Sequence, residues 1–145
     1  MTAPVSIRTF VYPDDLAAVY ELWATAGPGL HLGRSDSQAE IAKKLARDPD
    51  LFLVAELDGR IVGAVMGGFD GRRGLVYHLG VDATYRKNGI GRQLMDALEA
   101  RLRAKGCLRS YLLVTHDNLD AQRFYEGQGW EAMDLLIYAK DLDEL

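Results

Sequence analysis

The chain has 145 residues and a formal net charge of −4 at neutral pH, with 48% hydrophobic and 26% charged residues. This length is enough for one domain that buries its own core, so we expect a single domain over residues 1–145. The negative charge argues against nucleic acid or an anionic membrane as a partner. The N-terminus lacks a signal-peptide layout and no apolar run approaches the ~20 residues that cross a bilayer, so the default expectation is a cytoplasmic protein.

The first third of the chain predicts one strand and two helices. Residues 6–10 predict a first strand, and apolar residues at helical spacing from Leu16 to Trp23 predict the first helix. Gly27-Pro28-Gly29 ends that helix. After a loop over residues 27–36, a capping box at Ser37 opens the second helix.

The middle of the chain predicts a hairpin followed by alternating strands and helices. Residues 51–57 and 60–66 are almost wholly apolar and flank a two-residue Asp-Gly turn, which is typical of a β-hairpin buried on both faces. The predicted elements after it are a strand at 75–81, a helix at about 89–105, a strand at 110–114, a helix at about 120–128 and a strand at 135–139. A right-handed crossover makes the strand at 110–114 parallel to the one at 75–81.

The join between the strand at 75–81 and its helix is a glycine-containing turn, Arg86-Lys87-Asn88-Gly89-Ile90-Gly91-Arg92. Glycines let the backbone bend sharply or approach a ligand, and the first N–H groups of a helix suit phosphate oxygens. The P-loop string is absent, and the dinucleotide fingerprint lacks its third glycine and its acidic residue. The turn therefore fits a pyrophosphate best, with a close-packed turn that binds nothing as the alternative.

The single cysteine offers little chemistry. Cys107 has no partner for an internal disulfide, and the three scattered histidines do not build a zinc site with it. It precedes the amino end of the strand at 110–114, whereas ligands of such sheets lie beyond the carboxyl ends. We therefore expect Cys107 to be a small packed residue and not a nucleophile.

Three blocks of the sequence point to one family. They are Leu79-Gly80-Val81, then Tyr85-Arg86-x-x-Gly89-Ile90-Gly91-x-x-Leu94, then Asn118-x-x-Ala121-x-x-Phe124-Tyr125-Glu126-x-x-Gly129-Trp130. Together they resemble the GCN5-related N-acetyltransferase (GNAT) superfamily over roughly residues 51–130. The resemblance implies an α/β fold with a single mixed, mostly antiparallel central sheet of six to seven strands. A central parallel pair would be splayed for acetyl-CoA, and about four helices would flank the sheet.

The resemblance also implies the residues that hold acetyl-CoA, the cosubstrate, without a metal. Backbone N–H groups of Lys87, Asn88, Gly89, Ile90, Gly91 and Arg92 would hold the pyrophosphate, with Arg86 shaping the turn. The backbone of Leu79, Gly80 and Val81 would pair with the pantetheine arm and polarise the thioester carbonyl. Asn118 would contact pantetheine or cap the next helix.

Two catalytic residues are expected. Tyr125 matches the family tyrosine that protonates the leaving thiolate, with a core tyrosine as the alternative. A lysine-like amine with a pKa of about 10.4 must lose a proton before it attacks. Leucines occupy the strand positions where the family often carries a carboxylate, which leaves Glu56, Tyr77, His78 and His116 as candidate bases. His78 is preferred because imidazole exchanges a proton near neutral pH, with a packed histidine or a water relay as alternatives.

The expected activity is transfer of the acetyl group of acetyl-CoA to a primary amine, by direct attack in a ternary complex. The acceptor is a small molecule or a peptide, and the resemblance places its pocket along residues 27–36. Protein N-terminal or lysine acetylation, a non-catalytic acyl-CoA-binding regulatory domain and a nucleotide-binding module are the alternatives. The segment after Trp130 is short for the family's final hairpin, so it forms one bent strand or pairs with a second subunit in a homodimer.

Overall fold

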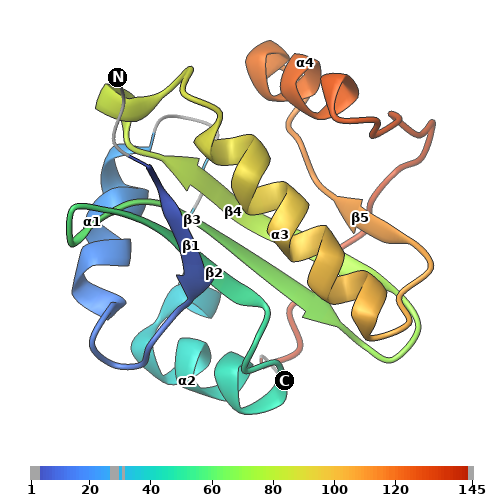
Figure 1. Cartoon of the computed structure of the whole chain (residues 1–145). Helices are drawn as coiled ribbons and strands as arrows, with labels where there is room; N and C mark the ends of the chain where they lie inside the picture. Colours follow the sequence, from blue (N-terminus) through green and yellow to red (C-terminus); the bar gives the residue numbers. More distant parts are fainter. Residues whose placement is uncertain (1–3, 27–29, 31, 144–145) are drawn as a thin grey trace.

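A five-stranded sheet with helices on both faces forms the body of the molecule (Figure 1). The computed structural model describes residues 4–26, 30 and 32–143. The strands are β1 (Ser6–Thr9), β2 (Phe52–Leu57), β3 (Arg60–Phe69), β4 (Gly74–Val81) and β5 (Ser110–Leu112). The helices are α1 (Leu16–Thr25), α2 (Gln38–Arg47), α3 (Ile90–Ala104) and α4 (Leu119–Gly127), with 3-10 turns η1 (Arg34–Asp36) and η2 (Ala83–Tyr85). Among these described helices, none combines the length and apolar character that crossing a bilayer requires.

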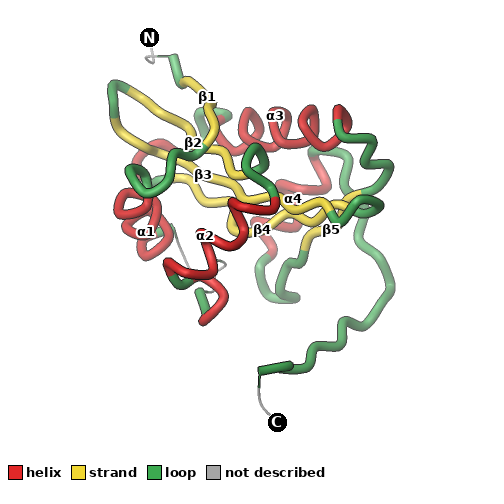
Figure 2. The backbone as a smooth tube through the Cα atoms, turned by 90° about the horizontal axis from the view of Figure 1, so that it is seen from below, coloured by secondary structure: helices red, strands yellow, loops and turns green. Residues whose placement is uncertain are grey.

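The strands lie in sequence order, and all neighbours are antiparallel except β4 and β5, which are parallel. Helix α3 makes the crossover between them and packs on one face of the sheet, while α1 and α2 lie on the opposite face (Figure 2). The mixed sheet with a parallel β4–β5 pair and four α-helices confirms the predicted fold class.

Strand β2 shows why both faces of the sheet are covered. Successive side chains of a strand point to opposite faces. Leu53 and Ala55 join the core beneath α3, whereas Phe52 and Val54 join a second core with α1 and α2. An apolar run without alternation therefore builds two cores, one on each side of the sheet.

Local sequence signals set the element boundaries. Asp58 and Gly59 both have positive φ, 50° and 77°, as a two-residue hairpin turn between twisted strands requires. The Ser37 side chain accepts a hydrogen bond from the backbone N–H of Glu40 and begins α2. The segment Gly27-Pro28-Gly29, expected to end α1, lies outside the described residues.

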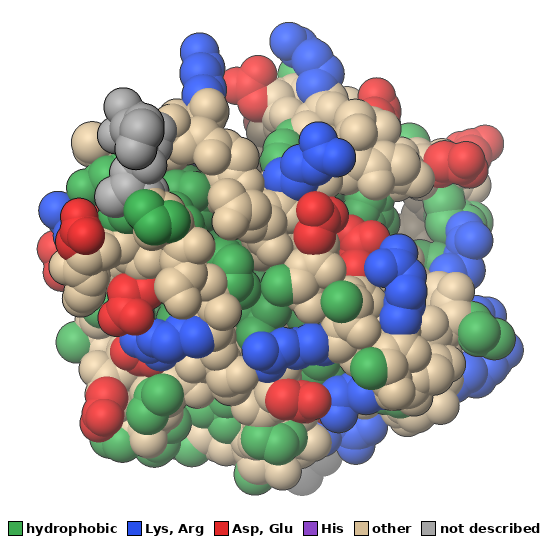
Figure 3. Space-filling view, in the orientation of Figure 1, with side chains coloured by type: hydrophobic (Ala, Val, Ile, Leu, Met, Phe, Trp, Pro, Cys, Tyr) green, Lys and Arg blue, Asp and Glu red, His purple; other side chains and the backbone are tan. Residues whose placement is uncertain are grey.

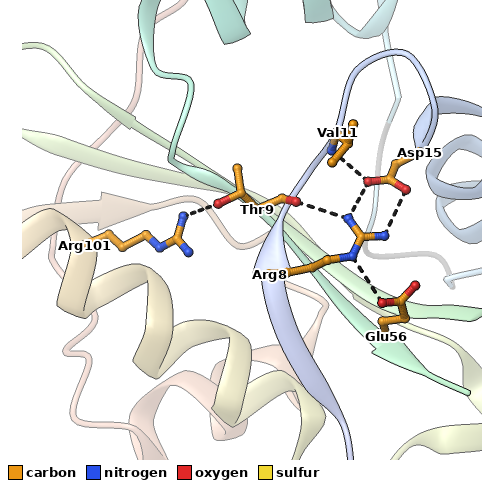
Figure 4. A network of polar contacts seen from close by, with 6 residues as sticks. All are labelled: Arg8, Thr9, Val11, Asp15, Glu56 and Arg101. Atoms are coloured by element: carbon orange, nitrogen blue, oxygen red, sulfur yellow. Dashed lines mark hydrogen bonds and ion pairs between the residues drawn. The ribbon is translucent and has the colours of Figure 1, made fainter. Parts of the chain in front are cut away.

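A charged cluster fixes β1 to its neighbours (Figure 4). The Arg8 guanidinium donates to both carboxylate oxygens of Asp15, at 2.7 and 3.0 Å, and to Glu56 at 3.2 Å. Asp15 also accepts from the backbone N–H of Val11. These contacts join the start of α1 to β1 and β2.

The sheet is smaller than the sequence predicts. It has five strands in the described part of the chain, not six to seven, and β5 ends at Leu112, not at residue 114. The expected strand at 135–139 is wrong for this structure: residues 131–140 form neither helix nor strand, and all are exposed. Their apolar character predicted burial, yet no strand of the described chain pairs with them.

Candidate active site

The pairing between the parallel strands β4 and β5 ends halfway along β4. Their pairing runs from Gly74 with Ser110 to Val76 with Leu112 and stops there, while β4 continues to Val81. The backbone of residues 77–81 therefore has no strand partner on its β5 side within the described structure. An extended ligand can hydrogen-bond to such an edge as an added strand would.

A β-bulge lies at the start of this open edge. Tyr77 pairs with Met66 and Gly80 with Ala64, so His78 and Leu79 both stand opposite the single residue 65. His78 has a φ of 48°, an uncommon conformation for a residue other than glycine. Because of the extra residue, Tyr77 and His78 lie on the same side of the sheet, the side of α1 and α2.

His78 makes a close contact with a carboxylate from another part of the chain. Its Nε2 atom lies 2.7 Å from Oδ1 of Asp36, in η1, and both side chains are largely buried. The ring of Trp23 packs edge-on against the imidazole, with centroids 5.1 Å apart. The Tyr20 hydroxyl donates to the backbone oxygen of Asp36 at 2.6 Å. The loop expected to line the acceptor pocket thus places an acid against the histidine.

The other candidate bases lie in different surroundings. Glu56, on β2, is ion-paired with Arg8 on β1. His116 is exposed in the loop after β5. Burial, with a smaller contribution from the nearby Asp48 carboxylate, raises the pKa of Tyr77. Of the four candidates, His78 is the one whose side chain contacts a carboxylate at the bulge.

The glycine turn presents free backbone donors at the start of α3. Gly89 is the residue before the helix, with a φ of 77°, and Lys87 also has a positive φ of 68°. Within the described chain, the backbone N–H groups of residues 87–92 donate no hydrogen bond. Lys and Arg side chains project at this end of the molecule, with Asp and Glu side chains beside them (Figure 3). Such a turn suits an anionic group.

Side chains of the turn hold its shape. Arg86 donates through Nε to the backbone oxygen of Val81 at 3.3 Å and through Nη2 to that of Ala26, at the end of α1. Asn88 donates to the backbone oxygens of Tyr85, at 3.0 Å, and Arg86. The Arg86 contacts tie the turn to the end of β4 and to the end of α1.

Two further residues of the turn, Ile90 and Arg92, lie in different surroundings. Ile90 is 2% exposed in the core, so only its backbone can reach a ligand. Arg92 lies 3.9 Å from Asp96 on the outer face of α3.

The two glycines of the turn have different roles. A Cβ atom on Gly89 would meet nothing within 4 Å, so its positive φ explains the glycine. A Cβ atom on Gly91 would lie 3.3 Å from the ring of Phe124 and 3.8 Å from Val81. Gly91 thus permits the close approach of α4 to α3, which the pyrophosphate interpretation did not foresee.

Helix α4 carries the other two predicted residues. The Asn118 side chain accepts from the backbone N–H of Ala121 at 3.1 Å, which makes it the N-cap of α4, one of its two expected roles. Tyr125 packs edge-on against Phe124 and Trp130. Burial raises the pKa of Tyr125 to about 12, so its phenol keeps its proton throughout the physiological range.

The remaining residues predicted to contact the donor, Leu79, Gly80 and Val81, lie at the end of β4. Cys107 lies elsewhere. Gly80 is buried, and a Cβ atom there would lie 3.2 Å from Ala26 and Leu30. Leu79 and Val81 are partly buried against the α3 core. Cys107 packs on the same core and beside Gly74, at the amino end of β5. That position agrees with its predicted packing role.

Asp36 is the residue that sequence reasoning missed. It lies 42 positions before His78, and no local pattern joins the two. Its place within residues 27–36 was the one available signal.

Comparison with known proteins agrees with this geometry. Residues 16–130 match the family model described as the acetyltransferase (GNAT) family. A Pectobacterium atrosepticum protein described as an acetyltransferase is 44% identical over 140 residues, 97% of each chain. The crystal structure of Ard1 from Thermoplasma volcanium superposes with a TM-score of 0.75 at 30% identity, covering 86% of this chain and 81% of that one. The PaiA N-acetyltransferase from Thermoplasma acidophilum, solved in complex with coenzyme A, shares the fold with a TM-score of 0.78 at 21% identity, over 91% and 92% of the chains.

The fold, with its divided parallel strands and the glycine turn beside them, is that of an acyltransferase. The chain belongs to the GNAT family and is an acetyl-CoA-dependent acetyltransferase.

Proposed function

We propose that this acetyltransferase acts on a primary amine, which enters beside His78 and Asp36 and attacks acetyl-CoA directly in a ternary complex. The observation that carries the proposal is the 2.7 Å contact between these two side chains at the bulge of β4. A carboxylate there attracts a cationic ammonium group, and a histidine held by it has a fixed orientation.

Acetyl-CoA is assigned to the gap between β4 and β5 and to the turn before α3. The pyrophosphate accepts hydrogen bonds from the backbone of residues 87–92, and the pantetheine arm pairs with the open edge of β4 at residues 79–81. Backbone N–H groups of that edge then polarise the thioester carbonyl. Asn118 contributes by capping α4, which carries Tyr125.

His78 takes one proton from the acceptor ammonium, and Asp36 orients its imidazole. The neutral amine forms the new C–N bond as the C–S bond breaks. The sulfur receives a proton from the Tyr125 hydroxyl, which regains one from the amine nitrogen through solvent. The overall reaction yields an amide, free CoA thiol and one proton.

The donor site is tested by calorimetric titration of the protein with acetyl-CoA, ATP and NAD. Gly89 and Gly59 share a φ of 77° and open space around the missing Cβ atom, so Gly89→Glu and Gly59→Glu carry the same backbone strain. We expect Gly89→Glu to lose acetyl-CoA binding and Gly59→Glu to keep it, because only the first places a carboxylate at the phosphate. Equal binding of acetyl-CoA by the two variants would contradict the assignment of the pyrophosphate to this turn.

The chemical step is tested by release of free thiol with a panel of primary amines. Tyr125→Phe should bind acetyl-CoA as the parent protein does but turn over slowly, because the phenol proton is missing. Unchanged turnover in this variant would contradict the assignment of Tyr125, whereas turnover of the parent with alcohols but with no amine would contradict the acceptor.

A further inference from the structure

Tyr77 is a partly exposed aromatic side chain at the bulge of β4. It is 39% exposed, and its ring centroid lies 6.5 Å from that of His78. The Asp36 carboxylate contacts the same imidazole at 2.7 Å. A molecule bound beside His78 is therefore within reach of both an aromatic ring and a carboxylate.

Packing holds the hydroxyl end of Tyr77 away from His78. A Cβ atom on Gly68, in β3, would lie 3.5 Å from the Tyr77 hydroxyl and 3.3 Å from Nζ of Lys44, in α2. The hydroxyl thus lies between β3 and α2. Because that end of the side chain is occupied, the part of Tyr77 next to His78 consists of ring carbon atoms. The face of such a ring attracts cations and covers apolar carbon chains.

The basic side chains around this place already have partners. Strand β4 and helix α1 contain no lysine or arginine, whereas η1 and α2 together contain four. These four contacts are Arg34 with Asp141 and Asp143 at 2.7 and 2.6 Å, Lys43 with Glu40 at 2.7 Å, Lys44 with Asp48 at 2.6 Å, and Arg47 with the backbone oxygen of Phe69 at 3.0 Å. A carboxylate on the acceptor would find no free cation on these elements, and it would face the carboxylate of Asp36.

We infer that the acceptor is a primary amine on an apolar carbon chain, with no carboxylate on the carbon that carries the amine, and that Tyr77 binds it. This inference rests on the acceptor position proposed above. The ammonium group lies between the Asp36 carboxylate and the face of Tyr77, since both attract a cation. The carbon atoms next to the nitrogen cover the ring. Free amino acids are excluded as a class, because Asp36 repels their carboxylate.

Matched pairs of acceptors test the class of substrate. Each primary amine that the parent protein acetylates is compared with the analogue that carries a carboxylate on the same carbon, such as butylamine with norvaline and phenethylamine with phenylalanine. We expect kcat/KM to be roughly 10–10²-fold lower for the carboxylate analogue, the scale of a like-charge contact. Equal kcat/KM values within the pairs would overturn the inference. Acetylation of no primary amine would instead contradict the proposed function itself.

Two variants at one position test the role of Tyr77. Tyr77→Leu removes the ring and should raise KM for the amine roughly tenfold, the scale of a cation–π contact. Its kcat at saturating amine should stay near that of the parent, because the ring contributes to binding and not to the chemical step. Tyr77→Phe keeps the ring and is the matched control, with KM and kcat both expected near the parent values.

Calorimetric titration with acetyl-CoA separates this role from a structural one. Both variants should bind acetyl-CoA as the parent protein does, since Tyr77 lies outside the assigned donor site. A parent KM in Tyr77→Leu, or an equal rise of KM in Tyr77→Phe and Tyr77→Leu, would show that the ring does not bind the acceptor. Loss of acetyl-CoA binding in Tyr77→Leu would assign the side chain to the fold and overturn the inference.

Discussion

His78 stands in a backbone conformation that a glycine adopts more easily. Its φ of 48° is costly for a side chain, and such strain often lies at functional sites. The side chain gains its position against Asp36 from this backbone. The bulge therefore has a chemical use in the proposed mechanism.

We expect His78→Gly to lower kcat roughly 10²–10⁴-fold, the usual contribution of a positioned base. Glycine accepts the positive φ, so the strand should keep its shape and leave a space for added imidazole. Steady-state assays with and without imidazole check this, and recovery of rate is expected for His78→Gly alone. His116→Gly is the control, since that histidine is exposed and away from the bulge. A variant with the parent rate would show that another group takes the proton.

The ion pair between Asp15 and Arg8 makes the stability of the fold depend on pH. Its hydrogen bonds from Arg8 hold the pKa of Asp15 below its ordinary value, so the ion pair stabilises the folded state above the unfolded pKa. That stability is lost as the pH falls through the folded pKa. We expect Asp15→Asn to cost about 1.5–3 kcal/mol at pH 7, the value of hydrogen bonds to charged groups.

Urea unfolding at several pH values measures this difference. The gap between parent and Asp15→Asn should close below about pH 4, where the unfolded carboxyl is protonated. Asp14→Asn, at the exposed neighbour, serves as the control and should change little. A gap of constant size at all pH values would show that the charge of Asp15 is unimportant.

At the same scale, sequence reasoning found side chains that lie in a local pattern and missed those that do not. His78 and Tyr125 lie in strand and helix patterns that the chain displays directly. Asp36 lies 42 positions before His78 in the sequence, and folding of the loop brings the two side chains together. Their contact therefore exists only after folding. The packing role of Gly91 was equally hidden, because it depends on Phe124 from another helix.

The contact between β3 and α3 is an element-scale feature that depends on one missing side chain. A Cβ atom on Gly67 would lie 2.6 Å from Cδ1 of Leu98, which is fully buried. We expect Gly67→Ala to cost about 1–3 kcal/mol, as overpacking does. Thermal unfolding measures this, with Gly33→Ala as control since nothing lies near that position. Leu98→Val should be less harmful in the Gly67→Ala background, and strict additivity would contradict the clash.

Strand prediction succeeded where apolar residues alone decide and failed where a neighbour must be present. β2, β3 and β4 were found because their sequences require burial within one chain. The strand expected at 135–139 carries the same kind of sequence, yet pairing needs an edge within reach. Strand β5 is shorter than predicted for a related reason. Beyond Leu112 it separates from β4, so residues 113 and 114 have no partner on that strand.

The whole molecule should become more stable when the donor binds. A ligand that binds the folded state alone adds about 2.7 kcal/mol to the free energy of unfolding at a hundredfold excess over its Kd. We expect acetyl-CoA to raise the unfolding temperature by this mechanism, while ATP and NAD at the same concentration have little effect. Differential scanning calorimetry provides the comparison, and Gly89→Glu should remove the acetyl-CoA effect without removing the transition. A parent protein whose transition is unmoved by acetyl-CoA would contradict the assigned donor site.

The bulge in β4 has a consequence for how this chain can diverge. The strand residues after it, Gly80 and Val81, owe the face of the sheet to which they point to one added position. Replacing His78 changes one side chain, but deleting it would exchange the two faces of the rest of the strand. The fold can thus tolerate a different amino acid at position 78 far better than a different number of residues between Tyr77 and Gly80, whatever the replacement of His78 does to the reaction.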